Sequence, residues 1–430
     1  MNKTRLFKKS IIAVTIALAS QQAVAAGFQL NAQSATGLGR AFAGDAVIAD
    51  NASSMARNPA TMALFDETAM SLGFVTITSM IEVKDATYTQ SYLDATGQPM
   101  SSSSQSANYD DAGGTSVAPN LHLIVPVNDK FAWGLNAYTN FGTKTEFDSS
   151  YVAGEYGGST DVKSFNLGLA GSYRINQQWS VGAGLDLVYG SGKFSRAMTT
   201  SGTKLVDIDA DGWGLGFNLG TVYEMNENNR FGLAYHYSPE LEADGDVNYA
   251  GYTGASGSIN DTLLMPLPDI LELSGYHRIE DTKFAVHYSV QWIGWSSFDK
   301  LEGKTSGTIN TYEWQNGMHY SLGGTYYLNE DWTIRAGYMY DTSAQDEVTS
   351  ISVPDSDRQW FSTGFTYHIT PKSNIDFGFT YLLGDDVKVS ESTTLPTGQT
   401  TPYPTYLNTN MEATTHADAI LVGLQYSRTF

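Results

Sequence analysis

The sequence predicts an all-β fold, a 14-stranded antiparallel transmembrane β-barrel with an N-terminal plug, or hatch, in its lumen. Three observations lead to it. The 430-residue chain starts with an export signal, it has no apolar run long enough to span a membrane as a helix, and it alternates between apolar and polar residues from Ser71 onward. An exported chain with long apolar strand faces is expected to cross a membrane as a closed barrel, which pairs every backbone group.

The export signal occupies residues 1–25. A basic head at residues 3–9 precedes an uncharged run at residues 11–19, and residues 23–25 form an A-x-A site. This order is typical of a cleaved signal peptide, and the apolar run is about half of the ~20 residues that a spanning helix needs. Cleavage would remove four of the 24 basic residues and none of the 45 acidic ones, which leaves a net charge of −25.

The composition narrows the classes of partner and fold. A strongly acidic chain repels phosphate backbones, so we expect no nucleic-acid partner. The sequence has no cysteine, so disulfides do not stabilise the exported protein. It has 26 Tyr and 42 Gly, and this richness in aromatic residues favours strands over helices.

Residues 283–292 illustrate the alternation. The even positions are apolar and the odd positions are polar or small: Phe284, Val286, Tyr288, Val290 and Trp292 against Lys283, Ala285, His287, Ser289 and Gln291. Similar runs continue to the C-terminus, where Phe430 ends the last predicted strand. One face of each strand is therefore expected to meet lipid and the other to meet a polar lumen.

The connections between the predicted strands alternate in length. Six are short polar turns, at residues 128–130, 176–178, 226–229, 280–281, 329–331 and 371–372. Seven are expected to be long polar loops, at residues 86–114, 147–159, 197–210, 239–264, 299–310, 342–356 and 385–412. Short turns on one side, long loops on the other and an even strand number are typical of bacterial outer-membrane barrels.

Aromatic residues flank the short turns, as at a membrane interface. Those that follow or precede a turn are Trp133, Trp179, Phe231, Phe284 and Trp332, and Tyr173, Tyr223, Tyr276, Tyr327 and Tyr367. We expect them to form a girdle at one edge of the lipid. The alternative, a soluble β-sandwich, would have to bury 14 long two-sided strands and would leave the girdle unexplained.

Residues 26–65 do not fit the barrel, which is expected to span residues 66–430. They lack sustained alternation, and Asn51 to Ala56 reads as a short helical turn that stops before Pro59. A lumen inside 14 strands is too wide for side chains alone to fill. We therefore expect these residues to form the plug.

The plug sequence carries a specific resemblance. The stretch GFQLNAQSATGLGRAFAGDAVIADNASSMARNPATMALFDE resembles the hatch of the FadL family of long-chain fatty-acid transporters, whose members begin GFQL, continue through GLGRA and AD, and reach RNPA. Similarity continues through PNLHLIVPVNDKFAWGLNAYTNFGTKTEF, GTYYLNEDWTIRAGYMYD and ISVPDSDRQWFSTGFTYHIT to Phe430. The resemblance implies passive uptake across the outer membrane of a Gram-negative bacterium, with an internal pocket, a hatch that rearranges and a sideways exit into the membrane.

The resemblance also implies roles for particular residues. The start of the hatch, Gly27 and Phe28, would help to form the tight pocket, and Arg196 late in the fifth strand would meet a carboxylate. The further polar lumen positions that match are Asp341, Asp355, Asp357 and Arg358. The alternatives are an Arg196 that faces lipid headgroups, and an ion-pair network that only stabilises the barrel wall.

The gate implied by the family is a kink in the third strand. The matching stretch is Asn140-Phe141-Gly142, where Gly142 permits a bulge that breaks ladder hydrogen bonds. The Asn58-Pro59-Ala60 triplet of the hatch would neighbour this kink, and Asn58 would bond backbone that the kink leaves unpaired. A packing role for Gly142 is the alternative.

The ligand stays open between long-chain fatty acids and aromatic or other uncharged hydrocarbons, because two long loops look short for the family and no second basic residue is evident near Glu313 to His319. A general porin is disfavoured because it needs no plug. We expect a monomer with no cofactor, in contact with outer-membrane lipid and lipopolysaccharide.

Other motifs carry little support. The DIDADG stretch at Asp207 to Gly212 lacks the bidentate Glu of a calcium loop and runs into a strand, which leaves at most a loose surface Ca²⁺ site. Ser289 and His287 share a polar strand face without a third triad member, so a lipid-processing enzyme is disfavoured. We expect no metal site and no enzymatic activity.

Overall fold

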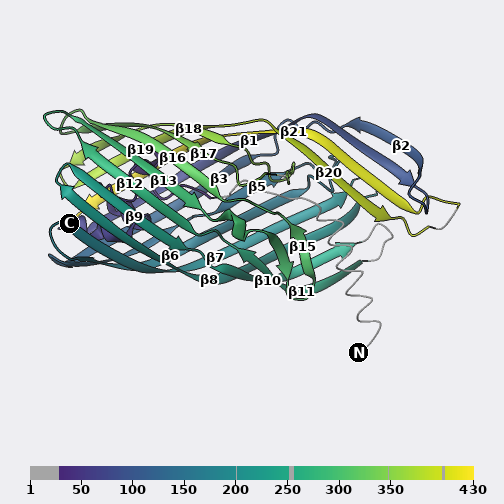
Figure 1. The fold of residues 1–430 in the computed structure, drawn as a ribbon, viewed down its shortest axis with the longest axis horizontal. Coiled ribbons are helices and arrows are strands. Elements are labelled where there is room, and N and C mark those ends of the chain that lie inside the picture. Colours follow the sequence, from purple (N-terminus) through teal and green to yellow (C-terminus); the bar gives the residue numbers. More distant parts are fainter. Residues whose placement is uncertain (1–28, 200, 251–255, 347, 400–401) are drawn as a thin grey trace.

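A computed structural model describes residues 29–199, 201–250, 256–346, 348–399 and 402–430, which form one long antiparallel barrel (Figure 1). The predicted signal peptide and the predicted pocket residues Gly27 and Phe28 lie outside the described residues. Twelve of the 21 strand segments form six consecutive pairs, and each pair makes one barrel strand. Eight further segments are single barrel strands, and β2 is an extra hairpin strand beside β1, so the barrel has 14 strands.

The strand segments are β1 (Ala69–Leu93), β2 (Pro99–Ser106), β3 (Gly114–Asn128), β4 (Phe131–Tyr138), β5 (Gly142–Glu146), β6 (Ser159–Arg174), β7 (Trp179–Met198), β8 (Thr203–Asn226), β9 (Asn229–Tyr237), β10 (Glu240–Ala250), β11 (Ser256–Pro266), β12 (Ile270–Arg278), β13 (Phe284–Ile293), β14 (Lys300–Gly303), β15 (Gly307–Thr311), β16 (Gly317–Tyr327), β17 (Trp332–Asp341), β18 (Arg358–Thr370), β19 (Ser373–Gly384), β20 (Val387–Pro396) and β21 (Tyr406–Thr429). A short 3-10 helix, η3 (Trp295–Ser297), follows β13. β1 pairs with β21 from Ala69 and Thr429 upward, which closes the barrel. The predicted closed all-β barrel is confirmed.

The alternation places apolar residues outside and polar residues in the lumen. On β13, Phe284 is 52% exposed whereas His287 is fully buried, and Ser289 and Gln291 are also buried. No helix among the described residues is long and apolar enough to cross a membrane.

The aromatic girdle forms by cross-strand ring contacts beside the short turns. Trp332 and Tyr367 have ring centroids 4.8 Å apart, and Trp179 and Tyr223 have theirs 4.7 Å apart. Tyr276 and Tyr327 are exceptions to the prediction. Tyr276 lies on the lumen face of β12 with 5% exposure, because the outward positions of that strand are odd-numbered. Tyr327 shares the lumen face of β16 with the buried Ser321 and Thr325, and the two tyrosine hydroxyls contact each other at 2.8 Å.

Several expected long loops are strands. Residues 197–210 are the ends of β7 and β8 around a tight turn, and residues 239–264 belong mostly to β10 and β11. β8 has 24 residues, more than twice the ~10 that a tilted spanning strand needs, so these hairpins extend beyond the membrane at the long-loop end (Figure 1). Asp207 to Gly212 therefore lie in a strand, and Asp209 is ion-paired with Lys193 at 2.7 Å.

The hatch, residues 29–65, contains three helical turns: α2 (Ala35–Leu38), η1 (Ala52–Ala56) and η2 (Pro59–Leu64). Asn51 caps η1, and the Asn58 side chain caps η2 by accepting from the Ala60 N–H at 2.9 Å. Pro59 thus begins a second turn, in addition to following the first, because proline fits the first position of a helix.

The hatch lies inside the barrel at its short-turn end, near the C-terminus (Figure 1). Its backbone N–H groups at Ala35, Ala46 and Ala52 donate to side chains of β21, β12 and β1 respectively. Because these strands surround the lumen, the hydrogen bonds show that the hatch is enclosed by the wall. Glycines on the lumen face let the two backbones approach closely; a Cβ at Gly220 would lie 1.9 Å from the Asn58 Oδ1.

We predict that Gly220→Ala loosens the hatch. The added methyl overlaps Asn58 and costs about 1–3 kcal/mol of packing free energy. Limited proteolysis of purified protein should cleave the hatch faster while the barrel stays intact. Gly324→Ala is the matched control, because a Cβ there has its nearest atom at 3.7 Å. Equal cleavage rates for the two variants would contradict the prediction.

Candidate functional site

The barrel wall has a gap at the predicted kink. The ladder between β3 and β4 runs up to Asn120 and Tyr138, and β5 then pairs with β6 alone among the described strands. Above this point residues 114–119 of β3 pair only with β1, until the Glu146 N–H donates to the Ala112 carbonyl at 2.9 Å. The wall gap therefore lies between residues 114–119 and 139–145.

The start of the hatch fills the inner side of the wall gap. The Leu30 N–H donates to the Asn140 carbonyl at 2.7 Å, and the Gln33 amide donates to the Asn140 side chain at 3.1 Å. Gln29 forms an isolated bridge with Phe141. The structure thus brings the predicted gate residues 140–142 together with hatch residues 29–33, which we call the kink-binding segment.

The Asn58-Pro59-Ala60 triplet lies elsewhere, so its predicted contact with the kink is wrong. The Asn58 side chain donates to the carbonyls of Ala46 at 2.7 Å and Thr221 at 3.0 Å. Pro59 and Ala60 press against Gly182 of β7. Asn58 therefore fixes the hatch to the β7–β8 wall, because its amide group has no kink carbonyl within reach and finds these two instead.

An apolar cavity lies above the hatch, with about 700 Å³ of space that is partly open to solvent. The apolar residues that line it include Val162, Phe194, Ile208, Leu263, Met265, Phe298, Leu301, Tyr312 and Val353. Lys193 is the charged residue among its described lining, and its ammonium is already paired with Asp209. A long apolar chain or a hydrocarbon fits such a lining better than a charged group does.

A second cavity, the gap cavity, reaches from the hatch to the wall gap. It has about 1,040 Å³ of space, partly open to solvent, and borders Leu30, residues 114–116 and residues 142–144. Its charged lining residues are Lys144, Asp355, Arg358 and Asp418. Thr143 borders both cavities, so the two adjoin beside the kink.

Arg196 is buried behind the wall of the apolar cavity. Its guanidinium donates to the carbonyls of Ser159 and Ser195 and to the Thr160 hydroxyl, and stacks on Phe194 at 3.8 Å. Arg196 itself borders neither cavity, whereas Thr160 and Phe194 line the apolar cavity. A carboxylate in the apolar cavity would therefore have to displace hydrogen bonds that Arg196 already makes.

The structure brings Asp341, Asp355, Asp357 and Arg358 together at the long-loop ends of β17 and β18. Arg358 pairs with Asp341 at 2.5 Å, and His319 pairs with the same carboxylate at 2.9 Å. Asp355 accepts from the Ala344 N–H at 2.7 Å; burial raises its pKa to about 6, while Arg358 acts to lower it. The cluster fixes the connection between the strands, and of its members Asp355 and Arg358 border the gap cavity.

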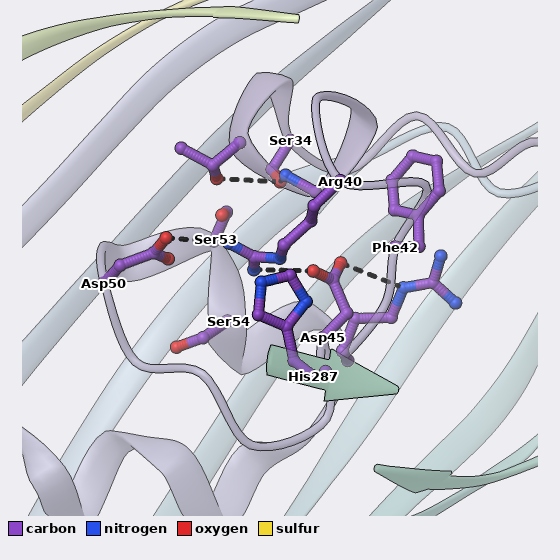
Figure 2. A network of polar contacts seen from close by, with 12 residues as sticks. Ser34, Arg40, Phe42, Asp45, Asp50, Ser53, Ser54 and His287 are labelled. Carbon is purple, nitrogen blue, oxygen red and sulfur yellow. Dashed lines mark hydrogen bonds and ion pairs between the residues drawn. The ribbon is translucent and has the colours of Figure 1, made fainter. Parts of the chain in front are cut away.

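A buried charge network that the sequence did not reveal holds the hatch (Figure 2). Arg40 pairs with Asp45 at 2.7 Å and with Asp50 at 2.8 Å. Arg57 lies 3.8 Å from Asp45 and 3.5 Å from Glu272 of β12. Removal of one partner from a buried pair typically costs about 3–5 kcal/mol, so this network strongly favours the seated hatch.

A strained turn lies beside this network. Ala41 and Phe42 both adopt left-handed backbone angles, with φ of 52° and 57°. This conformation costs roughly 1–2 kcal/mol for a residue with a side chain. It is held because Arg40 is paired on both sides and the Phe42 ring packs edge-on against Trp360 at 6.4 Å.

A polar cavity of about 590 Å³, partly open to solvent, adjoins the network. It borders Asp50, Arg335, His368 and Asp376 on strands and hatch. Arg335 lies 3.4 Å from Asp50 and donates to Thr366 at 2.6 Å. We call this cavity the lower polar cavity. Its lining offers polar partners to the charged groups of the hatch.

The long-loop end of the lumen is covered by residues 147–158. The Tyr88 hydroxyl donates to Glu155 at 2.5 Å, and the Tyr151 hydroxyl donates to the Ala107 carbonyl at 2.7 Å. Glu155 is 3% exposed, and burial raises its pKa to about 7. The cover is therefore held by a carboxyl group that gives up its proton near neutral pH.

Comparison with known proteins identifies the family. The model of the family described as outer membrane protein transport protein (OMPP1/FadL/TodX) matches residues 16–430. The chain belongs to this family. Its barrel is therefore an outer-membrane transport barrel, and the side with short turns faces the periplasm.

Relatives within the OMPP1/FadL/TodX family cover nearly the whole chain. The chain is 37% identical to the long-chain fatty acid transport protein of Escherichia coli O6:H1, over 91% of this chain and 94% of the relative. It is 37% identical to outer membrane protein P1 of Haemophilus influenzae, over 99% of both chains. The crystal structure of a Pseudomonas aeruginosa FadL homologue shares the fold, with a TM-score of 0.79 at 22% identity over 94% of this chain and 100% of that one.

The family is one of outer-membrane transport proteins. Within the described ranges, no group of three or more His, Cys, Asp or Glu residues is placed to hold a metal ion. His287 donates to or accepts from Thr325 at 3.0 Å, and Ser289 bonds Glu272 at 3.0 Å, so both belong to the hatch-binding wall.

We predict that the cover of residues 147–158 loosens as pH rises. The pKa of Glu155 is raised in the folded state, so its protonated form stabilises the cover fully below about pH 4.5 and this contribution is lost as pH rises through about 7. Hydrogen exchange of residues 147–158 should accelerate between pH 5.5 and 8, roughly across the window set by that pKa. This acceleration should exceed the intrinsic rise of exchange with pH, which is measured for the unfolded chain. Glu155→Gln should reduce that slope, whereas an unchanged slope would contradict the prediction.

Proposed function

We propose that the chain carries long-chain fatty acids and similar hydrophobic molecules passively across the outer membrane. The observation that carries this proposal is the apolar cavity, which lies above the seated hatch and adjoins the wall gap at Thr143. Each CH₂ group moved from water into such a cavity gains about 0.8 kcal/mol, which draws an alkyl chain in without energy coupling. One chain encloses both cavities, so a monomer suffices.

The proposed exit is lateral, through the wall gap. In the described structure the kink-binding segment occupies the inner side of the gap through Leu30, Gln33 and Asn140. When it moves away, the ligand passes from the gap cavity into the outer leaflet, beside the lipid part of lipopolysaccharide. The Asn140 carbonyl then loses the Leu30 N–H, and an unpaired backbone group costs free energy in lipid, which favours reclosure.

The named relatives favour fatty acids, with aromatic hydrocarbons as the second candidate. The E. coli O6:H1 relative bears the name long-chain fatty acid transport protein. Structures titled as toluene transporters share the fold with TM-scores of 0.60 to 0.65, at 16–18% identity. The apolar lining of the first cavity accommodates either an alkyl tail or an uncharged ring.

For a fatty acid, we propose that Lys144 receives the carboxylate, in place of the Arg196 expected from the resemblance. Lys144 lies on β5 directly after the kink and borders the gap cavity. Its partner Glu146 is 3.0 Å away, and both side chains are at least half exposed. Such an exposed pair is worth about 0–1 kcal/mol, so Lys144 exchanges partners easily, whereas Arg196 and Arg358 are held by buried bonds.

We predict that Lys144→Gln weakens oleate binding about threefold, the size expected for loss of one exposed charge pair, and leaves toluene binding unchanged. Arg196→Ala should weaken both ligands alike, because it disturbs the cavity wall. Isothermal titration with each ligand measures both effects. Selective loss of oleate binding in Arg196→Ala would instead favour Arg196 as the carboxylate partner.

We predict that vesicles containing the protein take up oleate but do not swell in solutions of small sugars. We also predict that Gly142→Tyr blocks the uptake of oleate, while oleate binding persists. A Cβ at position 142 would lie 3.0 Å from the Leu30 side chain, so tyrosine fills the gap. Gly324→Tyr is the control, because a Cβ there would have its nearest atom at 3.7 Å. Swelling in sugars without oleate uptake would overturn the proposed function, and normal uptake by Gly142→Tyr would overturn the lateral exit.

A further inference from the structure

Arg57 contacts three separate parts of the site. Its Nη2 donates to the side-chain oxygen of Asn31, in the kink-binding segment, at 2.5 Å. Its guanidinium lies 5.2 Å from the ring centroid of Phe42, in the strained turn. Its remaining nitrogens face Asp45 of the hatch and Glu272 of the barrel wall at 3.8 and 3.5 Å.

The shortest of these contacts is the one to the kink-binding segment. The segment that bonds the kink through Gln29, Leu30 and Gln33 therefore also supplies the shortest hydrogen bond of a buried cation. Arg57 is 5% exposed. Displacement of this segment from the kink breaks the Asn31 contact. A buried guanidinium that loses a partner must find another, because an uncompensated buried charge is strongly disfavoured.

The acceptors that Arg57 would turn to already have other partners. Glu272 accepts from Gln291 at 3.0 Å and from Ser274 at 2.9 Å, and Asp45 accepts from Arg40 at 2.7 Å. Arg40 faces the Oδ1 atom of Asp45 and Arg57 faces its Oδ2 atom, so a closer approach of Arg57 draws the shared carboxylate away from Arg40. Arg40 can then rely on Asp50, beside the lower polar cavity. The network therefore has a second arrangement within reach.

We propose that Arg57 is the positioning residue that couples the wall gap to the hatch. Displacement of the kink-binding segment releases Arg57 from Asn31, and the shift of Arg57 toward Asp45 then loosens the strained turn at Ala41 and Phe42. This inference rests on the proposed function, because it requires that the ligand moves the hatch. The left-handed turn at Ala41 and Phe42 is strained, and the Arg57 guanidinium packs against the Phe42 ring. This contact holds the turn in place until Asn31 moves away from Arg57.

The test uses a single reporter thiol in the hatch. The chain has no cysteine, so Ala43→Cys gives one thiol, at a fully buried position beside the strained turn. Its rate of modification by a water-soluble maleimide is measured in detergent-solubilised full-length protein, with and without oleate. We expect oleate to accelerate modification about tenfold, a typical coupling between two sites.

In the Ala43→Cys background, Arg57→Gln and Asn31→Ala should each reduce this acceleration to below about twofold, and the double variant should lose no more than either single variant. Oleate affinity, measured separately, should be retained in Arg57→Gln, because Arg57 borders neither cavity; Asn31 borders the gap cavity, so the rates of Asn31→Ala are compared at saturating oleate. A merely structural role would instead change the rate without oleate and leave the oleate response intact.

Arg174→Gln is the matched control. Arg174 also ties the hatch to the wall, through the Ala63 carbonyl at 2.9 Å and Glu224 at 2.9 Å, but it lies away from the kink-binding segment. It should keep the oleate response. If Arg57→Gln fails to assemble, Asn31→Ala, which removes one hydrogen bond, decides the question.

The outcomes separate the two proposals. An oleate response in Asn31→Ala and Arg57→Gln equal to that of the parent overturns the coupling role and leaves the proposed transport standing. Equal loss in Arg174→Gln also overturns it, since any hatch tie would then suffice. Oleate that binds the parent without any change in the modification rate of the reporter thiol overturns the coupling and the hatch rearrangement together, whereas absence of oleate binding overturns the proposed function itself.

Discussion

Everything in this site depends on one constraint: a backbone group inside a membrane barrel must have a hydrogen-bond partner. The described strands meet it by pairing with their neighbours, but beside residues 114–119 the kink ends the β3–β4 ladder. From inside, the hatch supplies partners to the kink: the Leu30 N–H bonds the Asn140 carbonyl and Gln33 bonds the Asn140 side chain. In the proposed transport, the segment that closes the wall gap also borders the gap cavity, so occupancy of that cavity and closure of the wall compete.

The hatch stays in place through two different kinds of contact. At the β7–β8 wall it is held by shape, because Asn58 and Pro59 fit against glycines that leave no room for a side chain. Near β12 and β17 it is held by buried charge, through Arg40, Arg57 and Arg335. Shape contacts resist any movement, whereas charge contacts can be exchanged between neighbouring carboxylates. The second side is therefore the one suited to rearrangement.

The cavities divide the chemistry of an amphiphile. The apolar cavity offers almost no charge, and the gap cavity offers both signs, with Lys144 the cation whose existing partner is easiest to replace. In the proposed function, a fatty acid therefore places its carboxylate near the wall gap and its tail in the apolar cavity. The exchange of one exposed pair for another has little net cost, which suits a channel that must release its ligand as well as bind it.

The sequence alone determined the barrel, its closure and the short-turn side, because strand alternation and turn placement are local properties set by the boundary between lipid and lumen, whereas the kink was expected only from the family resemblance. It misjudged residues 197–210, most of which belong to long strands, and Tyr276 and Tyr327, whose faces depend on strand register. Only the tertiary structure decided that Asn58 bonds the β7–β8 wall while Asn140 is bonded by Leu30, and that Arg57 faces Asn31 and Glu272. The contact between Arg57 and Glu272 joins residues 215 positions apart, and no local pattern encodes which buried partner a side chain meets.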